Sequence, residues 1–169
     1  MSADRDRDAL FGQVTAQCTG LISRIALSYE SNQALRRELI QDILLAVWVA
    51  LPAFRGDAAL KTFVASIAQK RSISHVTRRA REPRQVELPA DLISAGATPD
   101  EIAMRNDMHK QLVDSIQTLP IPQREAIVLS FEGFSYGEVA EVLGISVNAA
   151  TLRCQRAKAA LKSRMDRNG

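Results

Sequence analysis

Aromatic residues and cysteine are scarce in this chain of 169 residues. Aromatic side chains make up only 5% of the sequence, although 46% of the residues are hydrophobic. Strands favour aromatic residues, so the low aromatic content favours helices over a sandwich or barrel, as do apolar residues that are mostly Leu, Ile, Val and Ala and a total of eight glycines and six prolines. Cys18 and Cys154 are the two cysteines, and their wide separation excludes both a disulfide framework and the usual zinc-ligand spacing.

Long apolar runs and catalytic motifs are also missing from the sequence. No run reaches the roughly 18 apolar residues that a membrane span needs, and the first ten residues, MSADRDRDAL, lack the apolar core of a signal peptide. His75 and His109 have no metal-spaced partners, and the chain contains no nucleophile elbow or glycine-rich phosphate loop. We therefore expect a reduced, cytoplasmic protein that is not an enzyme, binds no metal or other cofactor and does not insert into a membrane.

Positive charge is clustered rather than abundant. The net charge is +3, but the segment RRAREPR at 78–84 holds four arginines against one glutamate, and the segment 153–167 holds six basic residues against Asp166 alone. Clusters of this kind are typical of a polyanion partner such as nucleic acid. A solvated helix face is the alternative for either cluster.

Hydrophobic periodicity predicts an all-α protein of two small helical domains. We expect a first domain at 1–80, with three helices over 10–30, 33–51 and 58–79, because apolar residues recur there at three- and four-residue spacing. The stretch 81–99 has no sustained period and contains Pro83, Pro89 and Pro99, which predicts a flexible linker. The domain at 100–169 is expected to hold four helices.

A helix-turn-helix is predicted near the C-terminus. Ser135 and Glu138 form a capping-box pattern that opens a helix over 136–143, and Gly144 is expected to end this helix in the left-handed conformation. Ser146 is placed to cap a following helix over about 147–165. In this motif the second helix enters the major groove of DNA with its N-terminal residues against base edges. A packed helical hairpin without DNA is the alternative interpretation.

The second helix carries side chains of two kinds on its exposed side. Asn148, Thr151 and Gln155 lie on roughly one face and could form hydrogen bonds with base edges. Arg153, Arg156 and Lys158 are expected to contact phosphates.

Two long segments resemble one family. The segment LPIPQREAIVLSFEGFSYGEVAEVLGISVNAATLRCQRAKAAL, 119–161, resembles the C-terminal promoter-binding domain of bacterial RNA polymerase sigma factors, and of the extracytoplasmic-function (ECF) group in particular. The segment ELIQDILLAVWVALPAFRGDAALKTFVASIAQKR, 38–71, resembles the core-binding and promoter-opening segments of the same family. The order of the two segments and the linker between them also match that family.

The resemblance implies a function and a set of site residues. It implies a sigma factor that binds core RNA polymerase and directs promoter recognition and transcription initiation. The residues implied to dock on the clamp helices of the largest polymerase subunit are Arg37, Glu38, Gln41, Asp42, Leu45 and Trp48. Those implied to face the downstream (−10) promoter element are Phe63, Ser66, Gln69, Lys70, Arg71, Ser74, His75, Arg78 and Arg79. Those implied to read the upstream (−35) element are Asn148, Ala149, Thr151, Leu152, Arg153, Gln155, Arg156 and Lys158.

Departures from the family pattern lead to further expectations. Leu35 and Arg37 stand where the family usually has acidic residues, which predicts weaker binding to core polymerase. Phe63 stands where the family usually has tryptophan, and we expect it to be a core or wedge residue. An anti-sigma factor is a partner that the sequence leaves open, as are the promoter and the inducing signal. The alternative function is a helix-turn-helix transcriptional regulator that is not a polymerase subunit, although this would leave 38–71 unexplained.

Overall fold

The computed structural model describes residues 2–83 and 99–168, with backbone alone for 99–105. These residues form helices and no strand. The first unit, 2–83, contains α1 (Ser2–Gln17), α2 (Thr19–Leu27), α3 (Gln33–Ala50), the short 3₁₀ helix η1 (Leu51–Ala53) and α4 (Leu60–Arg79). The second unit, 99–168, contains α5 (Pro99–Gln117), α6 (Ile121–Phe131), α7 (Tyr136–Leu143) and α8 (Val147–Asn168). The expected linker lies largely outside the described residues.

The prediction of one helix over 10–30 is wrong, because two helices, α1 and α2, occupy this region. The helical residues begin at Ser2 and are interrupted at Cys18. Two threonine hydroxyls bond to carbonyls of the preceding turn here, Thr15 to Gly12 at 3.0 Å and Thr19 to Thr15 at 2.6 Å. Such side-chain bonds compete with the backbone ladder and bend helices. The first unit therefore has four α-helices instead of the three expected.

The core of the first unit lies between α2, α3 and α4, which pack against one another. Its fully buried side chains include Ile22, Ile25, Ile43, Val47 and Val64. Helix α3 begins at Gln33 because the side chain of Asn32 caps it, accepting a hydrogen bond from the Leu35 amide at 3.0 Å. Helix α3 ends at Ala50 because Pro52, which lies in η1, has no backbone N–H to donate the next helical hydrogen bond.

The second unit confirms the predicted helix-turn-helix. The capping box of Ser135 and Glu138 is formed in both directions, and Gly144 adopts the left-handed conformation with φ of 65°. The Ser146 hydroxyl accepts a hydrogen bond from the Ala149 amide at 3.1 Å, so it caps the first turn of α8. Helix α8 packs on α5, α6 and α7 through its buried side chains, which include Cys154.

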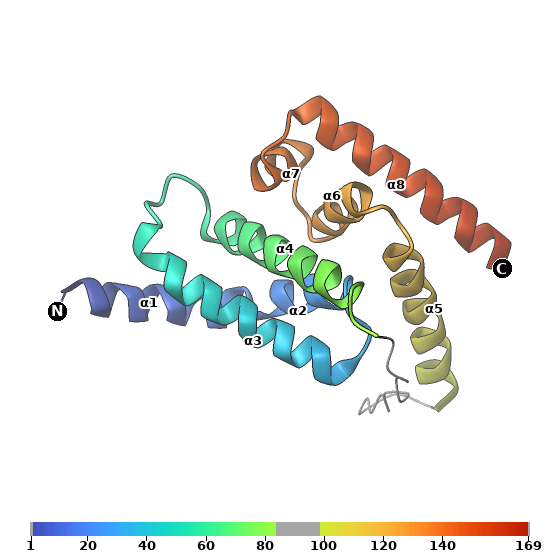
Figure 1. Ribbon diagram of the computed structural model, residues 1–169. Helices are drawn as coiled ribbons and strands as arrows, with labels where there is room; N and C mark the ends of the chain where they lie inside the picture. Colours follow the sequence, from blue (N-terminus) through green and yellow to red (C-terminus); the bar gives the residue numbers. More distant parts are fainter. Residues whose placement is uncertain (1, 84–98, 169) are drawn as a thin grey trace.

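The two units contact each other directly. In Figure 1, α4 lies in the middle of the molecule, with α3 on one side and α6 and α7 on the other. Helices α6 and α7 both pack against α4. The helix that carries the expected −10 residues is therefore covered on one side by the unit that carries the expected −35 residues.

Candidate nucleic-acid interface

Helix α8 presents a polar face to solvent and buries the opposite face. Ala150, Cys154 and Ala157 are buried against the rest of the second unit. The expected base-reading residues Asn148 and Gln155 are exposed. The N-terminal half of α8 therefore has an accessible side with donors and acceptors on it, as a helix in the major groove needs.

The remaining expected −35 residues differ in exposure. Leu152, Arg156 and Lys158 are exposed, whereas Ala149, Thr151 and Arg153 are half-buried. The Thr151 hydroxyl donates to the Val147 carbonyl at 2.8 Å, and the Lys158 ammonium donates to the Tyr136 hydroxyl at 3.1 Å. These two side chains are thus held against the surface of the helix-turn-helix.

Arg153 and Arg156 have different surroundings, although the sequence predicts phosphate contact for both. Burial raises the pKa of the Glu125 carboxyl on α6, and the positive charge of Arg153 lowers it. Half-buried Arg153 therefore lies close enough to an acidic side chain of its own unit to interact with it. Arg156 is exposed and is better placed for a phosphate.

The expected −10 residues on α4 differ in exposure: some face solvent, some are half-buried and some are buried. Lys70, Arg71, Ser74 and Arg78 are exposed, and Arg71 lies 3.9 Å from Asp42 of α3. Phe63 and Ser66 are half-buried, and the Phe63 ring lies 5.0 Å from that of Phe54, as expected of a core or wedge residue. The exposed set forms a basic and polar strip along α4.

The buried residues of the expected −10 set form hydrogen bonds within the protein. Gln69 and His75 are buried, with relative accessibilities of 2% and 6%. Gln69 accepts a hydrogen bond from the Tyr29 hydroxyl at 2.6 Å. In this arrangement Gln69 and His75 cannot reach a DNA strand, because their polar atoms face protein.

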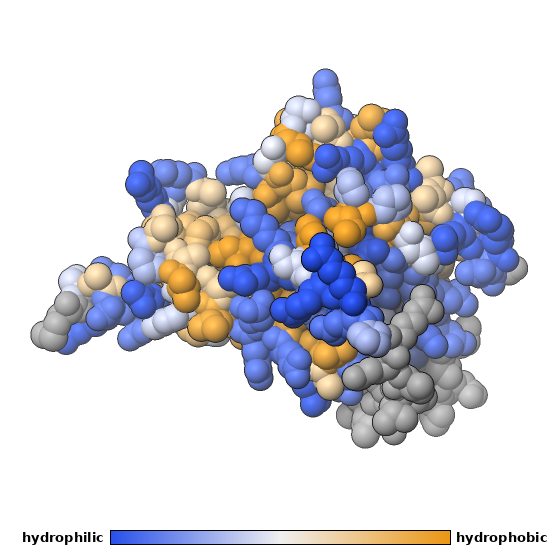
Figure 2. Space-filling model, viewed as in Figure 1, coloured by the Kyte–Doolittle hydropathy of each residue, from blue (hydrophilic) through white to orange (hydrophobic). Residues whose placement is uncertain are grey.

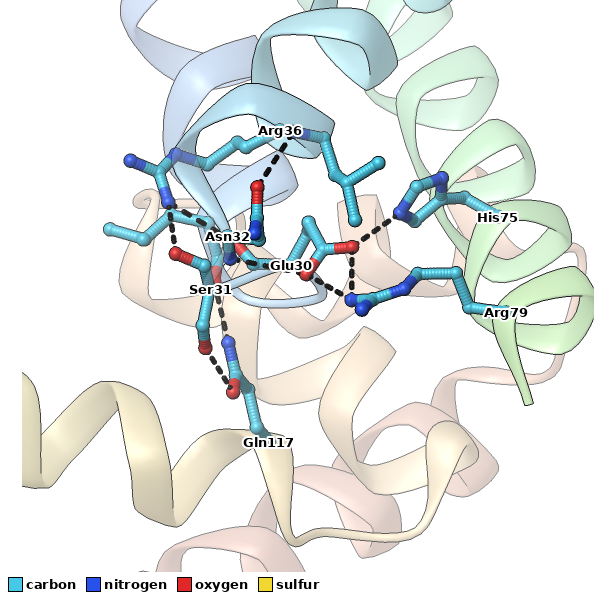
Figure 3. A network of polar contacts seen from close by, with 9 residues as sticks. Glu30, Ser31, Asn32, Arg36, His75, Arg79 and Gln117 are labelled. Carbon is cyan, nitrogen blue, oxygen red and sulfur yellow. Dashed lines mark hydrogen bonds and ion pairs between the residues drawn. The ribbon is translucent and has the colours of Figure 1, made fainter. Parts of the chain in front are cut away.

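A buried carboxylate organises the end of α4 (Figure 3). The side chain of Glu30 is 2% exposed and lies 2.8 Å from His75 Nε2. Both of its oxygens accept hydrogen bonds from Arg79, and one accepts from the Asn32 amide at 3.2 Å. A buried carboxylate needs such partners, since an isolated charge inside a protein is strongly unfavourable. Glu30 therefore holds α4 to the turn between α2 and α3.

The role of Glu30 was not predicted from the sequence. The sequence of α4 does contain a signal that one side of this helix is buried, because small and polar residues recur there at three- and four-residue spacing: Ala65, Ala68, Ser72, His75 and Arg79. This small and polar stripe continues the buried face of the helix, so it indicates an internal partner rather than DNA.

Helix α3 presents a second candidate surface. Arg37, Glu38, Gln41, Asp42 and Leu45 are all exposed. They are five of the six residues that the sequence assigns to polymerase docking, and they share the outer side of the helix.

Apolar side chains are exposed on the same helix. Leu45 is 61% exposed and Val49, four residues on, is 68% exposed. Figure 2 shows apolar surface over the part of the molecule where α3 lies. Val49 was not among the sequence-assigned residues, although its four-residue spacing from Leu45 places it on the same face.

Trp48 is less exposed than the other five residues assigned to docking, and the neighbouring Arg36 bonds to the backbone of its own unit. Trp48 is half-buried. The centres of its ring and of the Phe11 ring are 5.2 Å apart, with the two rings nearly perpendicular, and the Arg7 guanidinium lies 5.0 Å from the centre of the Trp48 ring. Arg36 donates to the carbonyls of Glu30 and Ser31 at 3.2 and 3.0 Å. Arg37 is therefore the arginine that adds exposed positive charge here.

The part of the chain that the structure describes contains neither a metal-binding cluster nor a membrane-spanning helix. No group of three or more metal-ligating side chains comes together in this part of the chain. None of its helices is long and apolar enough to cross a membrane.

Comparison with known families matches both halves of the chain. The family described as sigma-70 region 2 matches residues 16–82, and the family described as sigma-70, region 4, matches residues 109–161. The two matches cover separate parts of the chain, and together they cover more than two thirds of it.

Individual relatives agree with these matches. The RNA polymerase sigma-H factor of Pseudomonas aeruginosa is 28% identical over 152 residues, which cover 84% of this chain and 77% of that protein. The ECF RNA polymerase sigma-E factor of Escherichia coli is 25% identical over 138 residues, which cover 76% and 72% of the two chains.

Solved structures share the fold. CnrH, solved in complex with the cytosolic domain of CnrY, has a TM-score of 0.71 and 26% identity, with 94% of this chain and 89% of that chain covered. The sigma factor RpoE of Bartonella quintana, solved with the anti-sigma factor NepR, has a TM-score of 0.74 and 23% identity, with coverage of 92% and 96%.

These helical units, with a helix-turn-helix in the second, define a protein of the sigma-70 family, to which this chain belongs. Within that family it is an RNA polymerase sigma factor of the extracytoplasmic-function group. Its function is to bind core RNA polymerase and direct promoter recognition and transcription initiation.

Proposed function

We propose that three exposed surfaces divide the work of this sigma factor. The face of α8 with Asn148, Gln155 and Arg156 reads the −35 element. The strip of α4 with Lys70, Arg71, Ser74 and Arg78 contacts the −10 element. The outer side of α3, from Arg37 to Val49, docks on core polymerase.

The observation that carries the −35 assignment is the burial pattern of α8. Ala150, Cys154 and Ala157 anchor the helix, and this fixes which side chains point outward at its N-terminal end. Base-edge recognition by a helix-turn-helix uses that end. The predicted domain boundaries, 1–80 and 100–169, place one promoter-binding surface in each domain.

The −10 assignment is narrower than the one expected from sequence. Single-stranded DNA is bound by basic side chains along its backbone and by stacking on aromatic rings. The exposed strip of α4 supplies cations, whereas Phe63 is half-buried against Phe54. We therefore assign contact with the DNA backbone to Lys70, Arg71 and Arg78. We assign internal roles to Gln69, His75 and Arg79, because these side chains bond to Tyr29 and Glu30 of the same unit.

The docking surface on α3 combines charge with apolar area. Glu38 and Asp42 supply carboxylates, and Leu45 and Val49 supply exposed apolar side chains on the same helix. A mixed surface with an apolar centre and a polar rim is typical of protein interfaces. Polymerase binding implies a cytoplasmic location and a role as a regulatory subunit rather than an enzyme.

An anti-sigma factor is a further proposed partner. Two solved structures support this proposal, because CnrH was solved in complex with the cytosolic domain of CnrY and RpoE in complex with the anti-sigma factor NepR.

Transcription in vitro with purified core polymerase tests the assignment of surfaces. Wild-type protein should direct start sites on genomic fragments, and Leu45→Asp with Val49→Asp should abolish this while leaving DNA binding by the second unit intact. The matched control is Ala34→Asp, an exposed position at the start of the same helix. Equal transcription by the Leu45/Val49 variant and the control would refute docking through α3.

A further inference from the structure

Helix α1 contacts the docking helix α3 at the side chain of Trp48. Arg7 and Phe11 stand one turn apart on α1, so they share one face of that helix. The Arg7 guanidinium lies over the Trp48 ring, 5.0 Å from its centre, and the Phe11 ring is nearly perpendicular to the Trp48 ring with 5.2 Å between the centres. In Figure 1 the N-terminal turns of α1 extend beyond the C-terminal end of α3. Two side chains of α1 therefore contact one ring on α3.

The surroundings of Arg7 favour the ring as its partner. The Arg7 side chain is only 30% exposed, its Nε is buried, and no group in the described part of the chain accepts a hydrogen bond from Nε. The Asp4 carboxylate lies 4.0 Å from Arg7 Nη2 and its side chain is 82% exposed, so this ion pair is weak. A guanidinium is weakly hydrated and can stack on an aromatic face. The contact with Trp48 thus takes the place of a strong ion pair.

Trp48 lies at the border of the docking surface proposed for α3. Leu45 and Val49 are 61% and 68% exposed. At 3.6 residues per turn, Leu45 lies about 60° and Val49 about 100° around the helix from Trp48, both in the same direction. Trp48 is half-buried, so part of its side chain stays accessible beside these apolar residues. The orientation of the ring therefore shapes one edge of the surface.

We propose that Arg7 is a positioning residue for polymerase docking. By stacking on Trp48, Arg7 holds the indole ring at the edge of the α3 surface in the orientation that core polymerase contacts. The contact between Arg7 and Trp48 is a property of the chain alone, whereas its consequence for docking rests on the proposed function. Arg7 lies before residue 16, where the match to sigma-70 region 2 begins, so this match does not include it.

The strength of the contact sets the size of the expected effect. A side chain at a surface has several orientations, and a partner that accepts one of them binds more weakly when fewer molecules hold it. Cation–π contacts are weak at exposed sites and stronger when desolvated, and half-buried Arg7 lies between these cases. Removing the cation should therefore lower the ratio of the held orientation to the others about fivefold.

Fluorescence of the free protein tests the contact itself, because Trp48 is the single tryptophan. Arg7→Met keeps a long apolar side chain but removes the cation, so it should raise the quenching of Trp48 by acrylamide and lower its emission anisotropy. Arg7→Lys keeps a cation and should stay close to wild type. The matched control is Arg5→Met, which removes the same charge at an exposed position of α1. An Arg7→Met variant that matches Arg5→Met would show that Arg7 does not hold the ring.

Equilibrium binding to purified core polymerase tests the consequence. Arg7→Met should weaken binding about two- to fivefold, whereas Arg7→Lys and Arg5→Met should not. A double-mutant cycle with Trp48→Leu separates positioning from a general role in folding α1, because Arg7→Met should have no further effect once the ring is absent. Equal losses from Arg7→Met with and without Trp48→Leu would overturn the proposal. If Trp48→Leu does not fold, failure of Arg7→Lys to restore binding overturns it instead.

Leu45→Asp with Val49→Asp distinguishes this proposal from the proposed function. If that variant binds core polymerase as tightly as wild type, docking does not use α3, and the positioning role of Arg7 is wrong as well. The fluorescence comparison then still decides whether Arg7 holds the ring. If the Leu45/Val49 variant loses binding while Arg7→Met keeps the affinity of wild type, docking through α3 stands and the positioning role alone is overturned.

Discussion

Arg78 and Arg79 are neighbours in sequence with opposite surroundings, and this allows a sharp test of the structure. Arg78 is exposed, whereas Arg79 is 30% exposed and bonds to the buried carboxylate of Glu30. The same substitution at the two positions should therefore give opposite results. Arg79→Ala should lower stability and Arg78→Ala should weaken DNA binding.

The expected loss of stability follows from the burial of Glu30. Removing Arg79 leaves a carboxylate that is 2% exposed with His75 and one amide as its partners. Breaking a buried ion pair costs about 3–5 kcal/mol, and we lower this to about 2 kcal/mol because Arg79 is partly solvated. Arg78→Ala should change stability by less than about 0.5 kcal/mol, as exposed substitutions do.

Urea unfolding followed by tryptophan fluorescence measures both values. The single tryptophan, Trp48, lies in the first unit and reports its unfolding. With a denaturant slope of about 2 kcal/mol per molar, Arg79→Ala should lower the midpoint by about 1 M, and Arg78→Ala by less than about 0.25 M. Binding to single-stranded −10 DNA should show the reverse, with Arg78→Ala lowering the salt slope by about 0.7. Equal midpoints for the two variants would refute the structural role given to Arg79.

Three other predictions follow from the helix-turn-helix and from α3. Arg156→Ala should weaken binding to all duplex sequences and lower the salt slope by about 0.9, whereas Asn148→Ala should relax base preference by about 1–3 kcal/mol, as competition between specific and random DNA would reveal. Gly144→Ala should destabilise the second unit by about 1 kcal/mol in thermal unfolding, since φ there is 65°. Leu35→Asp with Arg37→Glu should tighten equilibrium binding to purified core polymerase, and unchanged or weaker binding would mean that Arg37 has an acidic partner on the polymerase.

The second unit was largely predictable from sequence because its signals are local. The bond of Ser135 to the Glu138 amide spans three residues, and the conformation of Gly144 depends on its own lack of a side chain. Patterns of this kind are visible in a short window. The positions of α7 and α8, and with them the face that carries Asn148 and Gln155, followed from these signals.

The spacing of small and polar residues on α4 indicates that one side of the helix is buried, but the partners of Gln69 and His75 could not be predicted because they are distant in sequence. His75 meets Glu30 across 45 residues, and Gln69 meets the Glu125 carbonyl across 56. A polar residue on a helix is predicted to face solvent when the neighbouring sequence offers it no partner. In the fold, the buried carboxylate of Glu30 supplies that partner from a distant position. The contacts between the units were missed for the same reason, since Arg24 and Glu132 are 108 residues apart.

Arg24 and Lys61 of the first unit donate hydrogen bonds to Glu132 of the second unit, which directly follows α6. Because these contacts cross from one unit to the other, unfolding of either unit removes hydrogen-bond partners from the other. Thermal unfolding of the two units should therefore be coupled, since segments that share contacts open together. A chain with Arg24→Glu would keep both folds, and calorimetry should show its two units unfolding in more widely separated steps.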